Sequence, residues 1–133
     1  MGQRDRRRSA VVRWGSIVRV NLDPAVGSEA DKTRPALVVC NDRAVRAAQR
    51  NGRGVISVLP ITSNTSRLYA FQVLIDGAAV DGAGLDQESK IQAEQIRSVD
   101  IRRIVEEVGE LPERLHLAVR EALALHLDLD IVE

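Results

Sequence analysis

Residues 35–40 read PALVVC, an almost wholly apolar run that opens with a proline. A short apolar run bounded by turn residues is typical of a strand buried on both faces. The proline fits this interpretation because the first residue of a strand tolerates the missing N–H. Residues 55–59, VISVL, form a second run of this kind and end at Pro60. The two runs predict a pair of buried strands at the centre of the fold.

Shorter segments flank these two strands. Four of them contain β-branched or apolar residues and stop near turn residues, which predicts further strands over residues 17–22, 69–75, 90–96 and 105–108. Asn41-Asp42 follows the first buried run and is predicted to cap a helix over residues 44–49.

The C-terminal segment has a different period. Pro112 stands where the first turn of a helix tolerates a proline, and apolar residues recur at helical spacing to about Leu127. This spacing predicts an amphipathic helix. Many short strands with one terminal helix predict a mainly β (α+β) fold, built as a small, strongly bent sheet or barrel.

Length and composition favour one globular domain. The chain has 133 residues, is 44% hydrophobic and 29% charged, and has a formal net charge near zero, values that exclude a disordered chain. It contains no apolar run of the roughly 20 residues that a membrane helix needs. The first eight residues are polar and basic, unlike a secretory signal, so a cytoplasmic location is predicted. The single cysteine, Cys40, allows neither an intramolecular disulfide nor a cysteine-based zinc site.

Charge is distributed unevenly along the chain. Residues 1–67 carry a net charge of +8 and residues 68–133 a net charge of −8. The split indicates either an anionic partner for one region or mutual neutralisation of the halves in the fold. Residues 1–14 contain five arginines and are predicted to be a basic, mobile arm. The arm either contacts a nucleic acid or is a solvated tail, and the domain proper is predicted over residues 15–133.

Several familiar catalytic arrangements are missing. His116 and His126 are the only histidines; both fall on the predicted terminal helix, about 15 Å apart in rise and on different faces. They therefore cannot act on one phosphate as a pair. The acidic residues show no HExxH or EF-hand spacing, so no metal site is predicted.

Polar residues remain where the two buried strands meet their loops. Residues 27–29, Gly-Ser-Glu, and Arg34 precede the first buried strand, and residues 62–64, Thr-Ser-Asn, follow the second. Adjacent strands would bring Arg34 and Thr62 together. The alternative is that Arg34 makes a surface salt bridge and Thr62 caps a turn.

Four blocks of sequence together resemble the MazF/PemK family of mRNA-cleaving toxins, with mycobacterial-type members as the best match. They cover residues 15–24, 27–39, 59–64 and 92–100, and follow the order of the family. One departure is Val18, which stands where members often carry an aromatic residue, while Trp14 precedes the opening glycine. Trp14 either replaces that aromatic in packing or stacks on a base.

The resemblance implies an SH3-like small β-barrel of the CcdB/PemK type with a C-terminal α-helix, assembled as a homodimer. It also implies cleavage of single-stranded RNA at short sequences, without metal or other cofactor, and neutralisation by a cognate antitoxin. The reaction would be attack of a ribose 2′-OH on the adjacent phosphate, which DNA cannot undergo.

The resemblance assigns roles to particular residues. Arg34 would stabilise charge on the reacting phosphate, Thr62 would donate its hydroxyl to a phosphate oxygen, and Glu29 would act as the base or orient Arg34. The predicted RNA contacts are Ser28, Ser63, Asn64, Lys90 and Gln95. For Lys90 the alternative is a solvated strand residue.

Two other functions fit a small barrel. A non-catalytic RNA-binding barrel would not need Arg34 and Thr62 together, but Tyr69 and Phe71 are the only aromatics besides Trp14 available for base stacking. A gyrase-poisoning toxin of the CcdB kind acts through a tryptophan near its C-terminus, whereas residues 131–133 read IVE. Both are less favoured than the nuclease.

Overall fold

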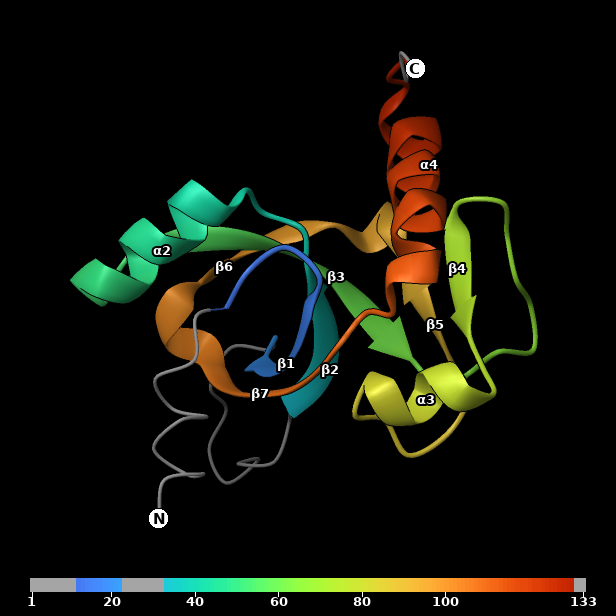
Figure 1. Cartoon of the computed structure of the whole chain (residues 1–133). Coiled ribbons are helices and arrows are strands. Elements are labelled where there is room, and N and C mark those ends of the chain that lie inside the picture. The colour runs from blue at the N-terminus through green and yellow to red at the C-terminus, as the bar shows by residue number, and fades with distance from the viewer. Residues whose placement is uncertain (1–11, 23–32, 131–133) are drawn as a thin grey trace.

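The computed structural model describes residues 12–22 and 33–130, which form a bent antiparallel sheet with helices at both ends (Figure 1). The strands of this part are β1 (Ser16–Asn21), β2 (Thr33–Val38), β3 (Val55–Thr62), β4 (Gln72–Ile75), β5 (Ser89–Gln92), β6 (Arg97–Asp100) and β7 (Ile104–Glu110). The helices are α2 (Asp42–Asn51), α3 (Ala78–Gly82) and α4 (His116–Leu127), with short 3-10 turns η1 (Ala93–Gln95), η2 (Ile101–Arg103) and η3 (Glu113–Leu115).

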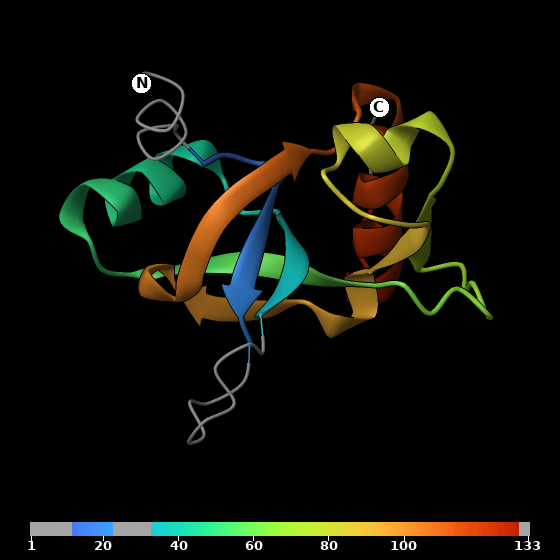
Figure 2. The same ribbon diagram turned by 90° about the horizontal axis from the view of Figure 1, so that it is seen from below.

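The long strand β3 organises the sheet. The strand order is β4-β5-β3-β2-β1-β7, and β6 pairs with β3. Residues 55–58 of β3 pair with β6, whereas Ile61 and Thr62 pair with β5. Because one strand carries two partners in succession, the sheet bends strongly along β3, as Figure 2 shows. The predicted bent sheet with a terminal helix is confirmed, although the described strand pairs do not close it into a complete barrel.

The two buried strands predicted from sequence bury both of their faces. Leu37 and Leu59 belong to the apolar cluster beneath α4, while Val38 and Val58 belong to the cluster beneath α2. Successive strand residues point to opposite faces, so neighbouring positions supply two cores. All four side chains are fully buried.

Helix α2 begins and ends as its sequence predicts. The side chain of Asn41 accepts a hydrogen bond from the N–H of Ala44, and Gly52 ends the helix in the left-handed conformation. Helix α4 begins at His116 rather than near Pro112, because residues 113–115 form a 3-10 turn first.

The predicted strand over residues 90–96 is wrong in its second half. Strand β5 ends at Gln92, and the turn η1 follows, with Ala93 buried in the core. Helix α3 was not predicted, since five residues are too few to establish a helical period. None of the described helices is long and apolar enough to span a membrane.

The start of the described chain packs into the domain. Val12 is buried in the cluster beneath α2, and its N–H donates to the side chain of Gln49 in that helix. Trp14 packs against the cluster beneath α4. Residues 12–14 of the predicted arm therefore belong to the domain, and residues 1–11 lie outside the described part.

Candidate functional site

A pocket of about 530 Å³ opens where β2 and β3 meet their loops. Polar and charged side chains from several strands and from the segment after α3 line it. They are Arg19, Arg34, Thr62, Ser63, Asp86, Gln87, Ser89, Gln92 and Arg97, together with apolar residues that include Leu22, Pro35, Pro60, Leu85 and Val108.

Strand register brings Arg34 and Thr62 to this pocket. Ala36 pairs with Pro60 in the antiparallel ladder of β2 and β3. Ala36–Pro60 is the last pair of this ladder; Arg34 stands two residues before Ala36 and Thr62 two residues after Pro60, so both lie at the same end of the strand pair. Both residues line the pocket, as the adjacency of the two strands predicts.

The guanidinium of Arg34 is available for a ligand. It is exposed, and among the described residues it makes one hydrogen bond, from Nη1 to the carbonyl oxygen of Thr33 at 3.3 Å. It forms no ion pair with a described residue. The surface salt bridge that was the alternative for Arg34 is therefore absent from the described chain, and the planar fork can grip an anion with two donors.

Two further arginines that the sequence prediction missed share the pocket. Arg19 comes from β1, and its Nη2 donates to Oγ1 of Thr33 at 2.7 Å. Arg97 comes from the first position of β6. Arg19 carried a detectable signal, because it is the exposed charge within the otherwise apolar run of β1. Three guanidiniums around one cavity favour an anionic ligand.

Thr62 begins a hydrogen-bonded turn. Its Oγ1 accepts from the N–H of Asn64 at 3.2 Å, and Oδ1 of Asn64 in turn accepts from both N–H and Oγ of Ser66. The turn-capping alternative for Thr62 is therefore correct for its oxygen. A hydroxyl also carries one donor, and no described residue accepts the hydrogen bond of Thr62. It can still donate to a ligand in the pocket.

The other predicted contacts have different fates. Ser63 lines the pocket, whereas Asn64 and Gln95 are exposed residues outside its lining. Ser28 and Glu29 lie outside the described residues. The roles of all five stay predictions.

The structure does not match either interpretation of Lys90 that the sequence offered. It is only 7% exposed, and its Nζ donates to the carbonyl oxygen of Arg67 at 2.6 Å beside the ring of Tyr69. It is thus not a solvated strand residue, and it does not line the pocket. Its ammonium supports the loop that follows Thr62, so the predicted direct contact with RNA is not supported.

The close packing of two backbone segments fixes the wall of the pocket that Gly84 to Gln87 form. A Cβ at Gly84 would overlap the carbonyl oxygen of Val108 in β7, and Gly84 has a φ of +73° that favours glycine. On the other side of this contact, a Cβ at Gly109 would overlap the backbone of Ala83. The two glycines let the wall approach β7.

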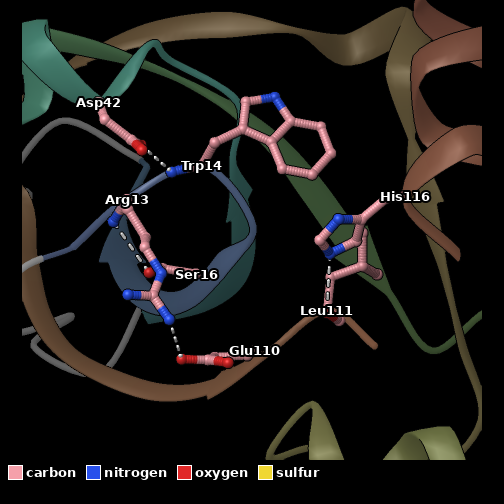
Figure 3. Close-up of polar contacts among 7 residues, drawn as sticks. All are labelled: Arg13, Trp14, Ser16, Asp42, Glu110, Leu111 and His116. Atoms are coloured by element: carbon pink, nitrogen blue, oxygen red, sulfur yellow. Dashed lines mark hydrogen bonds and ion pairs between the residues drawn. The ribbon is translucent and has the colours of Figure 1, made fainter. Parts of the chain in front are cut away.

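Trp14 does not line the pocket; it packs within the protein beside His116 (Figure 3). The backbone N–H of Trp14 donates to the carboxylate of Asp42. The indole ring meets the ring of His116 edge-on, with 5.0 Å between centroids, and the guanidinium of Arg120 lies 4.0 Å from the indole centroid. Nε2 of His116 lies 3.1 Å from the carbonyl oxygen of Leu111. The packing interpretation of Trp14 thus agrees with the structure, and His116 has a structural role.

Among residues 12–22 and 33–130, no three His, Cys, Asp or Glu side chains gather closely enough to hold a metal ion. The described pocket offers arginines, hydroxyls, amides and the carboxylate of Asp86 as its chemistry, and the prediction that no metal is needed stays a prediction.

The bent sheet with its terminal helix is shared with solved structures of ribonuclease toxins. The crystal structure of MazF from Deinococcus radiodurans is 27% identical with a TM-score of 0.67, over 91% of this chain and 100% of that one. A mycobacterial endoribonuclease in complex with its cognate antitoxin shares the fold, with a TM-score of 0.67 at 16% identity, over 92% of this chain and 99% of that one.

Sequence comparison identifies the family. The model of the PemK-like, MazF-like toxins of type II toxin-antitoxin systems matches residues 13–127, and the chain belongs to this family. Endoribonuclease MazF9 of Mycobacterium tuberculosis is 49% identical over 119 residues, which are 90% of this chain and 98% of that protein.

Proposed function

We propose that this chain is a sequence-specific endoribonuclease toxin that cleaves single-stranded RNA by attack of a ribose 2′-OH on the adjacent phosphate. The observation that carries the proposal is that Arg34 and Thr62, at the same end of the β2–β3 pair, line one pocket with two more arginines. Membership of the toxin family and similarity to a named endoribonuclease support it.

The proposed step needs charge stabilisation rather than a metal. The 2′-oxygen forms a bond to phosphorus while the bond to the 5′-oxygen breaks, leaving a 2′,3′-cyclic phosphate and a 5′-hydroxyl. A base accepts the 2′ proton, and the departing 5′-oxygen gains one. Arg34 would hold two phosphate oxygens and offset the added charge, and Thr62 would donate to one of them. Glu29 remains the proposed base.

The pocket also provides groups for base recognition. Gln87 and Gln92 carry amides that both donate and accept hydrogen bonds, and both line the pocket with Ser63. Such groups can read the exposed edges of unpaired bases. We assign these three residues to contacts with the bases beside the cut.

An antitoxin would neutralise the enzyme by occupying this pocket. A surface with three arginines also attracts acidic peptide, and a disordered acidic segment can cover a large area. The family is one of toxin–antitoxin pairs. The proposed setting is the cytoplasm, where messenger RNA and an antitoxin are both present.

A homodimer is the proposed assembly. Helix α4 exposes Leu117 and Leu125 at 59% and 57%, and a groove between α4 and β4 is lined mostly by small or apolar residues, with Gln72 and Glu121 among them. Uncovered apolar surface of this kind marks an interface. Sedimentation at micromolar concentration should give about twice the 14.6 kDa chain mass, and a stable monomer would contradict the assignment.

The test of the function is incubation of the purified chain with a long single-stranded RNA in excess EDTA. We expect discrete fragments with cyclic phosphate ends and no cutting of the DNA of the same sequence. RNA binding without cutting would instead support the non-catalytic barrel, and inhibition of gyrase without any effect on RNA would support the gyrase poison.

A further inference from the structure

Helix α2 presents a row of arginines on its outer face. Arg43, Arg46 and Arg50 are all exposed, and their spacing of three and four residues places them in line on one side of the helix. Val45 and Ala48 on the opposite side are buried in the sheet. We call Arg43, Arg46 and Arg50 the arginine ridge.

The ridge is unfavourable for the helix that carries it. Like charges three and four residues apart repel one another, and the helix dipole opposes Arg43 in the first turn, although it favours Arg50 in the last turn. The one acid of the helix, Asp42, accepts from the N–H of Trp14. No arginine of the ridge has a partner among the described residues. A local cost with no visible gain in the fold points to a function.

The helix holds the ridge rigidly in place. Asn41 and Gly52 cap its two ends, and Val45 and Ala48 anchor it to the sheet. Gln49 accepts the N–H of Val12, which ties the chain before β1 to the same helix. Fixed positions lower the entropy lost when a ligand is bound.

The arginine ridge and the pocket lie at opposite ends of the β2–β3 pair. Helix α2 connects the end of β2 to the start of β3, whereas Arg34 and Thr62 stand at the other ends of those strands. Val55 and Thr62, at the two ends of β3, are about 23 Å apart along an extended strand. A ligand that spans both sites must therefore be a polymer.

We propose that the arginine ridge is a second RNA site that binds the phosphate backbone of single-stranded RNA away from the cut. The choice of RNA as the ligand rests on the proposed function. Evenly spaced guanidiniums match evenly spaced phosphates, and the exposed residues of α2 include no large apolar side chain that would anchor a folded peptide. The ridge adds affinity for long RNA without reading sequence.

The test measures how RNA length affects affinity. Labelled 2′-O-methyl RNAs, which lack the attacking hydroxyl, are titrated with the full chain at several salt concentrations, using lengths of about 5 and about 25 nucleotides. The variants are the triple change Arg43→Gln, Arg46→Gln and Arg50→Gln and the corresponding triple change to Lys. Arg46→Gln and Arg114→Gln form a matched pair, because Arg114 is an exposed arginine in the turn η3, just before α4.

The glutamine triple should lower the ratio of long-RNA to short-RNA affinity by about 10- to 100-fold at low salt. It should also reduce the slope of log K against log salt by about 2, because each of the three lost phosphate contacts contributes about 0.7. The lysine triple should keep most of the slope, and Arg114→Gln should leave the ratio unchanged. Circular dichroism checks that the variants fold.

An unchanged ratio and slope in the folded glutamine triple would overturn the proposal. So would normal binding of long RNA together with lost binding of an acidic peptide, which would make the ridge a protein site. Cutting of unmodified short RNA is scored separately, so an inactive wild type would refute the proposed function while the binding result still judged the ridge.

Discussion

The two ends of the β2–β3 pair both display arginines, but in different surroundings. Around the pocket, Arg34 and Thr62 share the lining with Ser63 and the carboxylate of Asp86. On α2, the ridge arginines stand on a convex surface with only small or polar neighbours. Chemistry on a phosphate needs several groups that converge on one atom. A convex row can only hold a chain, so identical side chains are suited to different tasks.

The interior reflects the same division. The cluster beneath α4 includes Leu59 and Ile61, next to the pocket, while the cluster beneath α2 includes Val45 and Ile56. Strand β3 contributes to both, because its faces are buried on opposite sides. Each end of the molecule therefore has its own core, and a change at one end should affect the other little.

The largest expected effect is at Arg34. Arg34→Ala should lower the rate of RNA cleavage by about 10³- to 10⁵-fold, the range for arginines that stabilise charge in phosphoryl transfer. Arg34 is exposed at the start of a buried strand, so the fold should persist. Cleavage of a short RNA with chelator present measures the effect, with circular dichroism as the folding control.

Three variants sharpen the interpretation of Arg34→Ala. Arg34→Lys should recover only part of the rate, because a point charge cannot grip two oxygens at once. His116→Ala and His126→Ala should stay close to wild-type activity, since neither histidine lines the pocket. Full activity in Arg34→Ala would show that the pocket does not carry out the chemistry, and that it is not distinguished from the ridge in this way.

Thr62→Val should have the second largest effect. The change keeps the shape of the side chain and removes the hydroxyl that donates to the phosphate, at a cost of about 10²- to 10³-fold in rate. It also deprives the N–H of Asn64 of its acceptor. Thr62→Ser restores both functions and should restore most of the rate. Equal rates in the Val and Ser variants would show that the Thr62 hydroxyl contributes nothing to cleavage.

Gly109→Ala should damage the pocket wall without touching the ridge. The added methyl would overlap the backbone of Ala83, and overpacking of this kind typically costs about 1–3 kcal/mol. Gly82→Ala is the matched control, because a Cβ there meets nothing within 4 Å. Urea unfolding should show a lower midpoint for Gly109→Ala alone. The rate of RNA cleavage by Gly109→Ala should fall, whereas the salt dependence of its binding to long RNA should stay closer to that of the wild type.

The buried strands could be predicted because their sequence leaves few alternatives. Residues 35–40 are apolar at successive positions and residues 55–59 are apolar except at Ser57, a pattern typical of a strand covered on both faces. The meeting of Arg34 and Thr62 followed from the adjacency of those two strands. Residue patterns alone suggested this meeting, and the family resemblance gave the two residues their roles.

The remainder of the pocket depends on contacts between distant parts of the chain. Strand β3 exchanges its partner between β5 and β6 at a 3-10 turn, which places Arg97 in the pocket. No local period encodes that exchange. Lys90 looked like a ligand-binding cation because burial cannot be read from one charged residue in a strand. The helix that carries the arginine ridge was predicted from sequence, but the lack of acidic partners for its arginines among the described residues can be seen only in the structure.

The smallest expected effect is at Asp100, which links the two ends through β6. Asp100 pairs with Val55 near α2, and Arg97 at the other end of β6 lines the pocket. Hydrogen bonds from the side chain and backbone of Arg102 lower the pKa of Asp100 from 3.8 to about 2. A lowered pKa means that the ionised form stabilises the fold above pH 3.8, and that this contribution is lost as the pH falls toward about 2.

Asp100→Asn should therefore show a smaller loss of stability on acidification than wild type, measured as urea midpoints between about pH 5 and about pH 2.5. Glu113→Gln, at an exposed acid without a described partner, should follow wild type. Because the ion pair of Asp100 with Arg102 lies at the surface, where solvent screens it, the change should be small, and RNA cleavage at neutral pH should be preserved. A large loss of cleavage in Asp100→Asn would show that β6 couples the two ends and that they are not independent.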